Sequence, residues 1–330
     1  MDIFYVADDR FIPQAAASCC SIFENHTDVS RLRIFVGALH VSEENKSNLR
    51  RFARSYEREI HIIEIEDIET LIPFDFDAMG WNKVAVARLA IDRLLPEDVE
   101  KVLYLDADTI VRGDLSDLWD FPMDGRVVAA SPEPTADKRR RQSLCLGDHP
   151  YVNSGVLLID LQLWRKNGTG QRILSYYRDR GGKLFAIDQD AINGALCGEI
   201  AILSPEYNYF NVFDVYPYRV LRKVSQPAPF LAKEDFASVR KNPVIIHYLG
   251  EERPWRKGNR HLFSDDYHRY LDKTPWQSTP MEEGWTLYFS LFYLFDFIMR
   301  PVPALRYKII NSLIPAFLKF RKARLEKRVS

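Results

Sequence analysis

The sequence predicts an α/β fold with a mostly parallel central sheet flanked by helices. Short apolar, β-branched runs alternate with longer helical stretches through the first half of the chain. Acidic residues follow several of these runs at the point where each strand is expected to end. The chain has 330 residues, of which 46% are hydrophobic, so it can bury a large core. Parallel strands need crossover helices, and this alternation therefore indicates βαβ units.

The expected elements follow in chain order. The first half predicts strands at Ile3–Ala7, Leu32–Ala38, Ile60–Ile65 and Val102–Leu105, with helices near Pro13–Asn25, at Ser42–Tyr56 and at Val84–Leu95. The second half predicts a strand at Tyr151–Ile159, a helix starting over Asp160–Trp164, a short helix at Asp188–Leu196 and a strand at Asn242–His247. Ligands of such sheets bind beyond the carboxyl ends of the strands, so we expect the site there.

Residues 132–150 are polar and rich in helix breakers, which predicts a long loop. The basic stretch Lys138–Arg141 within it could close over a ligand or meet a phosphorylated acceptor. A solvated surface loop is the alternative.

The last part of the chain changes character. Trp285–Met299 is apolar and rich in aromatic residues, but it is too short to span a bilayer. Leu305, Ile309, Leu313 and Phe317 then recur at helical spacing, in a pattern interrupted by Pro315. Residues 300–330 hold nine Lys or Arg and one Glu, a net charge of +8. A basic, aromatic, amphipathic segment favours an anionic membrane surface.

We therefore expect two parts, a catalytic domain at 1–265 and a membrane-associating helical region at 266–330. The alternative is a helical hairpin that packs on the main domain and has a solvated basic end. The net charge of the whole chain is −1, which gives no bias toward nucleic acid. Four cysteines without a CxxC pair, and no recognisable signal peptide, indicate the cytoplasm.

The segment KVLYLDADTI (101–110) ends a buried strand in two carboxylates, Asp106 and Asp108. Like charges this close repel each other, and a divalent cation removes the conflict. Two carboxylates suit Mg²⁺ or Mn²⁺, and an imidazole such as His247 shifts the preference toward Mn²⁺. The alternative is a simple turn made by Asp108 and Thr109.

Three further segments are candidates for the same site. Small and polar residues interrupt the strand start at Asn153–Gly155, which permits close approach of a hydroxyl-bearing ligand. Asp188, Gln189 and Asp190 open a predicted helix and suit recognition of a polyol. HYLGEERPWRKG (247–258) combines Gly250, which permits a tight turn, with three cations for a phosphate group, namely Arg253, Arg256 and Lys257. Trp255 stacks on a ligand or simply packs.

Six segments in order resemble the family 8 retaining glycosyltransferases of GT-A fold, and especially the bacterial lipopolysaccharide and lipooligosaccharide galactosyl- and glucosyltransferases. They are YVADD (5–9), ARLAI (87–91), KVLYLDADTIVRGDLSDLW (101–119), YVNSGVLLIDLQLW (151–164), DQDAIN (188–193) and HYLGEERPW (247–255). The resemblance covers about residues 1–260. It implies a Rossmann-like GT-A domain, a UDP-sugar donor (UDP-galactose or UDP-glucose) and a divalent metal, usually Mn²⁺ with Mg²⁺ as the alternative.

The resemblance also implies roles for individual residues. The metal ligands would be Asp106, Asp108 and His247. The UDP part of the donor would be bound by Ala7, Asp8, Phe11, Ala107, Gly250 and Arg253, with Phe11 stacking on uracil. The sugar would be bound by Arg88, Asn153 and Asp188, with Gln189 near the reacting carbon. Two residues depart from the relatives: Arg253 replaces a common Lys, and Arg10 replaces a small polar residue near the base.

Retention of configuration can arise by double displacement or by attack of the acceptor on the face that UDP leaves. We expect same-face attack, because the amide of Gln189 is a poor nucleophile. Asp188 is the only nearby carboxylate that the sequence indicates, and we expect it to be engaged with sugar hydroxyls. The resemblance implies a glycolipid acceptor, the lipopolysaccharide core, at the cytoplasmic face of the inner membrane. Alternatives are a protein or other glycan acceptor, or a membrane-peripheral UDP-binding protein without turnover. A nucleotidyltransferase is disfavoured, because VADDRFIPQ lacks a glycine-rich phosphate loop.

Overall fold

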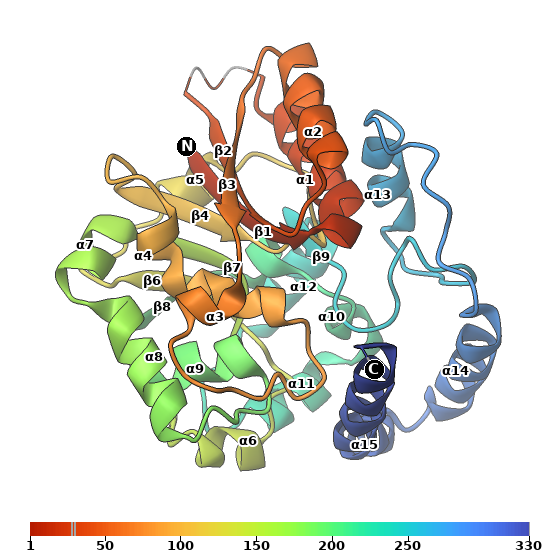
Figure 1. Ribbon diagram of the computed structural model, residues 1–330. Helices are drawn as coiled ribbons and strands as arrows, with labels where there is room; N and C mark the ends of the chain where they lie inside the picture. The colour runs from red at the N-terminus through yellow and green to blue at the C-terminus, as the bar shows by residue number, and fades with distance from the viewer. Residues whose placement is uncertain (28, 30, 330) are drawn as a thin grey trace.

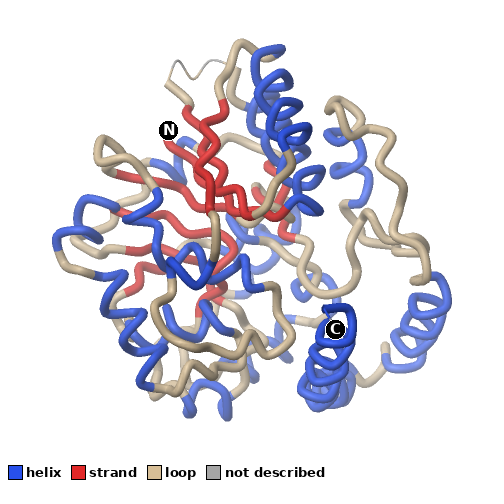
Figure 2. The backbone as a smooth tube through the Cα atoms, viewed as in Figure 1, coloured by secondary structure: helices blue, strands red, loops and turns tan. Residues whose placement is uncertain are grey.

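A single large sheet organises the molecule (Figures 1 and 2). The computed structural model describes residues 1–27, 29 and 31–329, with the backbone alone for 324–329. Over these residues seven strands form one sheet in the order β3-β2-β1-β4-β7-β6-β8, and β5 pairs with β9 in a second. The strands are β1 (Asp2–Asp8), β2 (Arg33–Leu39), β3 (Ile60–Ile65), β4 (Lys101–Leu105), β5 (Thr109–Val111), β6 (Val128–Pro132), β7 (Val152–Asp160), β8 (Ile200–Ile202) and β9 (Ile245–His247).

Helices cover both faces of this sheet. The α-helices are α1 (Ile12–Asn25), α2 (Glu43–Ser55), α3 (Ile68–Leu71), α4 (Ile91–Leu94), α5 (Ser116–Trp119), α6 (Lys138–Ser143), α7 (Leu161–Lys166), α8 (Thr169–Asp179), α9 (Ile187–Ala195), α10 (Val212–Val215), α11 (Tyr218–Ser225), α12 (Lys233–Lys241), α13 (Ser264–Leu271), α14 (Thr286–Met299) and α15 (Pro303–Val329). The 3₁₀ helices are η1 (Asp9–Phe11), η2 (Lys83–Ala90) and η3 (Pro205–Asn208).

Each face of the sheet carries its own hydrophobic core. Along β1, Ile3 and Tyr5 point into one core and Phe4 and Val6 into the other, because successive side chains of a strand alternate. The first core is closed by α1, α2 and α13, and the second by η2, α7, α8 and α9. Strands buried on both faces explain why these segments are continuous apolar runs in the sequence.

The sheet is mostly parallel, as predicted, but its direction reverses at β7. β1 runs parallel to β2 and β4, β2 to β3, and β6 to β8. β7 runs antiparallel to both β4 and β6. Because Leu105 pairs with Val156, the start of β7 lies beside the end of β4. The sequence predicted the strand but not its direction, since an apolar run reads alike both ways.

Two predicted elements were wrong in type. The helix expected at Val84–Leu95 is mainly the 3₁₀ helix η2, followed by the short α4. Within this segment Arg88 Nε donates to the carbonyl of Ala85 at 2.9 Å, a contact that the apolar periodicity of the sequence does not indicate. The loop expected at 132–150 contains α6, whose first turn is capped by Asp137. A short, strongly basic helix lacks the apolar periodicity on which helix prediction depends.

The basic stretch Lys138–Arg141 divides into two pairs. Arg140 binds Asp190 and Arg141 donates to the carbonyls of Ser225 and Gln226, so neither is a solvated or mobile loop residue. Lys138 and Arg139 are exposed, as the solvated alternative expected.

The C-terminal segment consists of α13, α14 and α15 (Figure 1). α13 packs against α1. α15 is a continuous helix through Pro315, where the sequence pattern predicted an interruption, and Ser330 lies outside the described residues. The start of α15 is held to the main sheet region, because Arg306 Nη1 donates to the hydroxyl of Tyr216 at 2.6 Å. Among the described residues, no helix combines the length and hydrophobicity needed to cross a bilayer.

Candidate active site

Three side chains predicted as metal ligands meet at one point. Asp106 follows β4, Asp108 precedes β5, and His247 ends β9. The antiparallel pairing of β5 with β9 places Thr109 opposite His247 and so brings the imidazole to the two acids. His247 Nε2 lies 3.3 Å from Asp108 Oδ1 and 3.7 Å from Asp106 Oδ2. One ligand atom of each residue lies within 4.8 Å of the others.

Asn208, which the sequence analysis missed, orients the histidine. His247 Nδ1 lies 2.9 Å from Asn208 Oδ1, and Asn208 Nδ2 donates in turn to Asn153 Oδ1 at 2.9 Å. Since Asn208 Oδ1 can only accept, Nδ1–H is the donor of this bond, and Nε2 is the ring nitrogen that faces the carboxylates. Asn208 belongs to η3, among aromatic residues with no strand end, so no sequence pattern marked it.

The donor set fits a hard or borderline divalent cation. Two carboxylates and one imidazole are ligands that Mn²⁺ accepts, and they leave coordination positions for phosphate oxygens and water. Gly155 supplies room beside them. A Cβ added there would lie 2.1 Å from His247 Cε1 and 2.9 Å from Asp106 Oδ2. Glycine at the start of β7 is therefore required for the imidazole and the carboxylate to approach the strand this closely.

Asp108 is held ionised by its neighbours. Burial acts to raise the pKa of Asp108, but the Arg253 guanidinium and the His247 ring outweigh burial and lower the pKa to about 2. Arg253 Nη2 lies 3.2 Å from Asp108 Oδ2. The residue predicted to neutralise a diphosphate thus already lies beside the three predicted metal ligands, Asp106, Asp108 and His247. We refer to these three side chains as the metal cluster.

A second, more deeply buried group adjoins Asp106. The Arg88 side chain is 4% exposed; its Nη2 donates to Asp106 Oδ1 at 2.6 Å and its Nε lies 3.2 Å from Asp188 Oδ2. Arg88 also donates to the carbonyl of Ser154 and lies over the ring of Tyr104. One guanidinium therefore fixes two carboxylates, one in the turn after β4 and one in α9.

Asp188 is the carboxylate with the most unusual environment. Burial raises the pKa of Asp188, the Arg88 charge opposes this, and the Asp106 charge adds to it, which leaves the pKa at about 6. The Ser154 hydroxyl donates to Asp188 Oδ2 at 2.9 Å. A buried carboxylate with few fixed donors is suited to accept hydrogen bonds from hydroxyl groups of a ligand.

Gln189 lies next to a carboxylate that the sequence analysis did not identify. Gln189 Nε2 donates to Glu133 Oε2 at 2.7 Å and to the Tyr151 hydroxyl at 2.9 Å. Glu133 Oε2 also accepts from Asn153 Nδ2 at 3.1 Å. The expectation that Asp188 would be the only carboxylate near Gln189 was wrong. Glu133 follows β6, a strand that the sequence analysis did not predict, so no strand end pointed to it.

The residues predicted for the nucleoside lie at the end of β1. Asp8 accepts from the backbone N–H of Phe11 and from Asn82 Nδ2, each at 3.2 Å. The guanidinium of Arg253 lies 5.7 Å from the centre of the Phe11 ring, which links this side to the metal cluster. Ala7 is buried near the end of β1.

Two further predicted residues act through their backbone positions. Ala107 is buried between the two acids of the metal cluster. Gly250 has a φ of 80°, a conformation that glycine adopts without strain, while a Cβ there would meet nothing within 4 Å. Gly250 therefore permits the turn after β9.

Other candidates are engaged elsewhere. Asp190 binds the Tyr151 hydroxyl and Arg140, so it does not face a polyol. Arg256 pairs with Glu251 and Glu282, and Lys257 pairs with Glu283, which leaves Arg253 as the cation of this segment that contacts the metal cluster. Trp255 is 5% exposed and packs on neighbouring aromatic rings, as its packing alternative expected.

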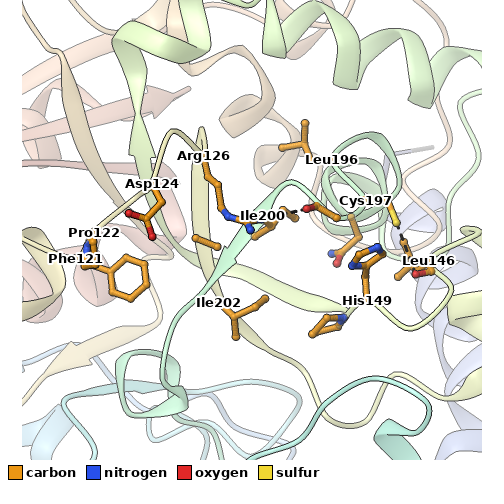
Figure 3. Close-up of a pocket in the computed structure, with 14 residues that line it drawn as sticks. Phe121, Pro122, Asp124, Arg126, Leu146, His149, Leu196, Cys197, Ile200 and Ile202 are labelled. Carbon is orange, nitrogen blue, oxygen red and sulfur yellow. Dashed lines mark hydrogen bonds between the residues drawn. The ribbon is translucent and has the colours of Figure 1, made fainter.

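A separate hollow of about 350 Å³ lies away from this cluster (Figure 3). It is lined by Phe121, Arg126, His149, Cys197 and Ile200 among others, and by none of the predicted metal or sugar residues. Its walls come from the β8 side of the sheet, so it is not part of the candidate site.

A model of the family described as Glycosyl transferase family 8 matches residues 2–258. The chain belongs to this family. It is therefore a glycosyltransferase, as the six segments predicted. General stress protein A of Bacillus subtilis is 25% identical over 281 residues, which are 84% of this chain and 95% of that protein. The lipopolysaccharide 1,2-glucosyltransferase of Escherichia coli K12 is 28% identical over 202 residues, which are 60% of this chain and 56% of that protein.

Solved structures of similar proteins have the same fold. The galactosyltransferase LgtC, solved with donor and acceptor sugar analogues, superposes with a TM-score of 0.69 at 22% identity. The match covers 86% of this chain and 99% of LgtC. The predicted GT-A architecture is thereby confirmed. The family model ends at residue 258, before α14 and α15.

Proposed function

We propose that the protein is a metal-dependent retaining hexosyltransferase. It transfers galactose or glucose from a UDP-sugar to a lipopolysaccharide or lipooligosaccharide core acceptor. The observation that carries the proposal is the Asp106–Asp108–His247 cluster, with ligand atoms within 4.8 Å of one another and the Arg88–Asp188 pair beside it. Membership of family 8 and similarity to a lipopolysaccharide glucosyltransferase and to the galactosyltransferase LgtC support this substrate class.

The three ligands would hold Mn²⁺, with Mg²⁺ as the alternative. When bound, the ion would supply positive charge that stabilises the leaving UDP. Arg253 contributes a second positive charge on the same side, since its guanidinium already lies 3.2 Å from Asp108. In this proposal Asp8 and Phe11 bind ribose and uracil, and Ala7, Ala107 and Gly250 line the nucleotide.

The residues around the start of β7 recognise the sugar. Asp188 accepts hydrogen bonds from sugar hydroxyls, and Arg88 and Asn153 contact the donor sugar. Gln189 lies near the reacting carbon. Its amide is tied to Glu133 and Tyr151, which holds it in place but does not make it a nucleophile.

The proposed stereochemical course is attack of the acceptor on the face that UDP leaves. The presence of Glu133 makes a sharper test possible than Asp188 alone, because Glu133 is a second, partly buried carboxylate near Gln189. Mass spectrometry of the protein after incubation with donor distinguishes the two mechanisms. A hexose adduct on Asp188 or Glu133 would establish double displacement and overturn same-face attack.

The acceptor is proposed to lie in the cytoplasmic leaflet of the inner membrane. On α14, the exposed apolar side chains Leu287, Leu291, Leu294, Phe297 and Ile298 are between 55% and 74% accessible. Such an exposed apolar surface beside basic residues suits an anionic membrane. In this proposal residues 1–265 are the catalytic domain and 266–330 the membrane-associating region, with the boundary inside α13.

The first experiment is UDP release by the purified protein from a panel of nucleotide sugars, with Mn²⁺, with Mg²⁺ and with a chelator. Mn²⁺-dependent release from UDP-galactose or UDP-glucose is the expected result and names the donor. The double variant Asp106→Ala/Asp108→Ala should lose this activity while keeping its circular dichroism spectrum. Release of equal size in the presence of the chelator would overturn the metal dependence.

The acceptor is tested with the same assay and radiolabelled donor. Lipopolysaccharide core, a neutral oligosaccharide and total cell protein are compared as acceptors. Label in the glycolipid fraction supports the proposal, and label in protein replaces it with a protein-directed transferase. If calorimetry detects UDP binding but no donor gives transfer or hydrolysis, the protein binds UDP without turnover.

A further inference from the structure

The end of helix α15 lies against a loop that borders the nucleoside side of the site. A Cβ added to Gly80 would lie 2.6 Å from the carbonyl oxygen of Leu318, so the backbones of the helix and the loop are in direct contact. Two residues further along this loop, Asn82 donates to Asp8. α15 therefore reaches the side of the site where uracil and ribose are proposed to bind.

The same turn of α15 also reaches the diphosphate side. Arg321 Nη1 lies 3.9 Å from Glu251 Oε1, in the turn that follows β9. Arg253, two residues after Glu251, is the guanidinium beside Asp108. Residues Leu318–Arg321 thus connect the two sides of the site, although they lie far beyond residue 258, where the family model ends. Figure 1 shows α15, with its end marked C, between α14 and the α/β part of the molecule.

Several other guanidinium groups lie near the Arg321 side chain. Its side chain is 33% exposed. Burial lowers the pKa of Arg321; Glu251 opposes this, and the like charges of Arg253, Arg256 and Arg10 lower it further. Glu251 does not fully compensate Arg321, because it pairs with Arg256 and lies beyond hydrogen-bonding distance of Arg321. A group of guanidinium ions of this kind is stabilised by an anion with several acceptor oxygens.

We infer that Arg321 is a further phosphate-binding residue of the donor site, contributed by the C-terminal helix. The inference rests on the proposed function, because the anion it names is the diphosphate of the UDP-sugar. Arg253 and Arg321 then approach the diphosphate from the turn after β9 and from α15. Helix α15 therefore contributes directly to donor affinity, in addition to packing against the rest of the protein.

The test is calorimetric binding of UDP and of uridine in the presence of Mn²⁺ to the full chain and its variants. Arg321→Ala should weaken UDP binding about tenfold, the usual effect of losing a charged hydrogen bond. Arg321→Lys should recover part of the affinity, because it restores a cation without the planar fork. Uridine has no phosphate, so its affinity should be unchanged.

Lys319→Ala is the matched control, since it removes an exposed cation from the same helix. It should leave UDP affinity within about twofold of wild type. If Arg321→Ala alters the circular dichroism spectrum, Arg321→Gln keeps the length of the side chain and takes its place. In steady-state assays, Arg321→Ala should raise the KM for the donor by a similar factor and leave kcat nearly unchanged.

The outcomes separate this inference from the proposed function. If the wild-type protein binds no UDP with Mn²⁺, the proposed function fails first. If the wild type binds UDP and Arg321→Ala binds it equally well, the inference is overturned and the proposed function stands. Equal losses for UDP and uridine would also overturn it, because they would indicate a structural role for Arg321. Normal UDP affinity with lost transfer to a phosphorylated acceptor would assign Arg321 to the acceptor instead.

Discussion

Asp106 and Asp108 have different surroundings although a single residue separates them. Asp106 accepts from Arg88 and from the Tyr104 hydroxyl, whereas Asp108 faces Arg253 and His247. Each carboxylate thus has its own guanidinium, and both face the same imidazole. This arrangement explains how an apolar strand can end in two acids: the turn after β4 distributes them to separate partners, and the remaining oxygens converge.

Gly155→Ala tests how closely the cluster is packed. The new Cβ would overlap the His247 ring, so the ring must move away from the two acids. We expect the affinity for Mn²⁺ to fall at least about tenfold, as changes to the surroundings of a metal ligand usually cause. Calorimetry with Mn²⁺ measures it. Gly113→Ala is the control, because its Cβ would meet only Val244 Cγ1, at an ordinary 3.6 Å. Unchanged affinity in Gly155→Ala would contradict the packing argument.

Asp188→Asn tests the electrostatic environment of the sugar side. Because the pKa of Asp188 is raised to about 6, the folded state binds more protons than the unfolded state between pH 4 and 6. The free energy of unfolding should therefore decrease as the pH rises through this window, by about 1–3 kcal/mol. Asparagine has no proton to lose, and the decrease should be smaller in the variant, while transfer activity is lost.

Urea unfolding of the metal-free wild type and of the Asp188→Asn variant, at several pH values from 4 to 7, gives these free energies. Asp235→Asn, which changes an exposed acid on α12, is the control. Identical pH dependence of wild type and Asp188→Asn would show that Asp188 is not the group responsible.

At the scale of elements, the direction of β7 decides where the site lies. In an all-parallel sheet, the start of this strand would lie at the opposite edge from Asp106. Because β7 is antiparallel, the backbone N–H of Asp106 donates to the carbonyl of Gly155 at 2.8 Å, and Asn153 and Ser154 lie beside the metal cluster. Sequence motifs identified these residues, but only the strand direction explains why they meet.

Helix α14 has an exposed apolar face that should determine membrane binding. Leu287, Leu291 and Leu294 follow helical spacing, and each is more than half exposed. Replacing all three with Gln should lower binding to anionic phosphatidylglycerol vesicles by at least about tenfold, since three apolar side chains no longer enter the lipid. Flotation of vesicles measures it. UDP release from the donor should stay at the wild-type rate.

Ile202→Gln, at an exposed apolar position on β8, is the control and should not change flotation. Wild-type flotation of the triple variant would show that the exposed face of α14 does not determine membrane binding. Substitution is preferable here to deletion of the C-terminal helices, because α15 also contacts the site.

For the whole molecule, the sequence was most informative where structure is local. Apolar runs located β1 to β4, and their polar ends located Asp8, Asp106 and Asp108. The motif at Asn153–Gly155 and the strand ending in His247 completed the cluster. These residues could be located because strand ends and closely spaced acids form short, ordered sequence patterns.

The remaining site residues could not be predicted from such patterns. Asn208, Glu133 and Arg321 reach the site from η3, from the turn after β6 and from the last helix. Their positions depend on how distant elements pack, and nothing in their neighbouring residues distinguishes them from ordinary surface or turn residues. The cations at Arg256 and Lys257 show the opposite error, because a motif suggested a phosphate site and local acids had already paired them.

Ligand binding should stabilise the whole fold, since the site joins residues from both halves of the sheet. UDP and Mn²⁺ together, each at about a hundred times its dissociation constant, should raise the free energy of unfolding by roughly 3 kcal/mol or more and the melting temperature by several degrees. Thermal melting with and without the two ligands measures it. The Asp106→Ala/Asp108→Ala variant should show no shift with Mn²⁺, and an equal shift would place the ion elsewhere.

The pairing of β5 with β9 has a consequence for how the protein is made. Thr109 and His247 are partners in space, but 138 residues separate them in the chain (247 − 109). At about 5–20 residues per second, a ribosome needs roughly 7–28 s to pass from one to the other. During this interval the nascent chain holds both acids without the imidazole. Assembly of the proposed metal site is therefore a late event in biosynthesis, and a translation product that ends before β9 lacks one of the three proposed ligands.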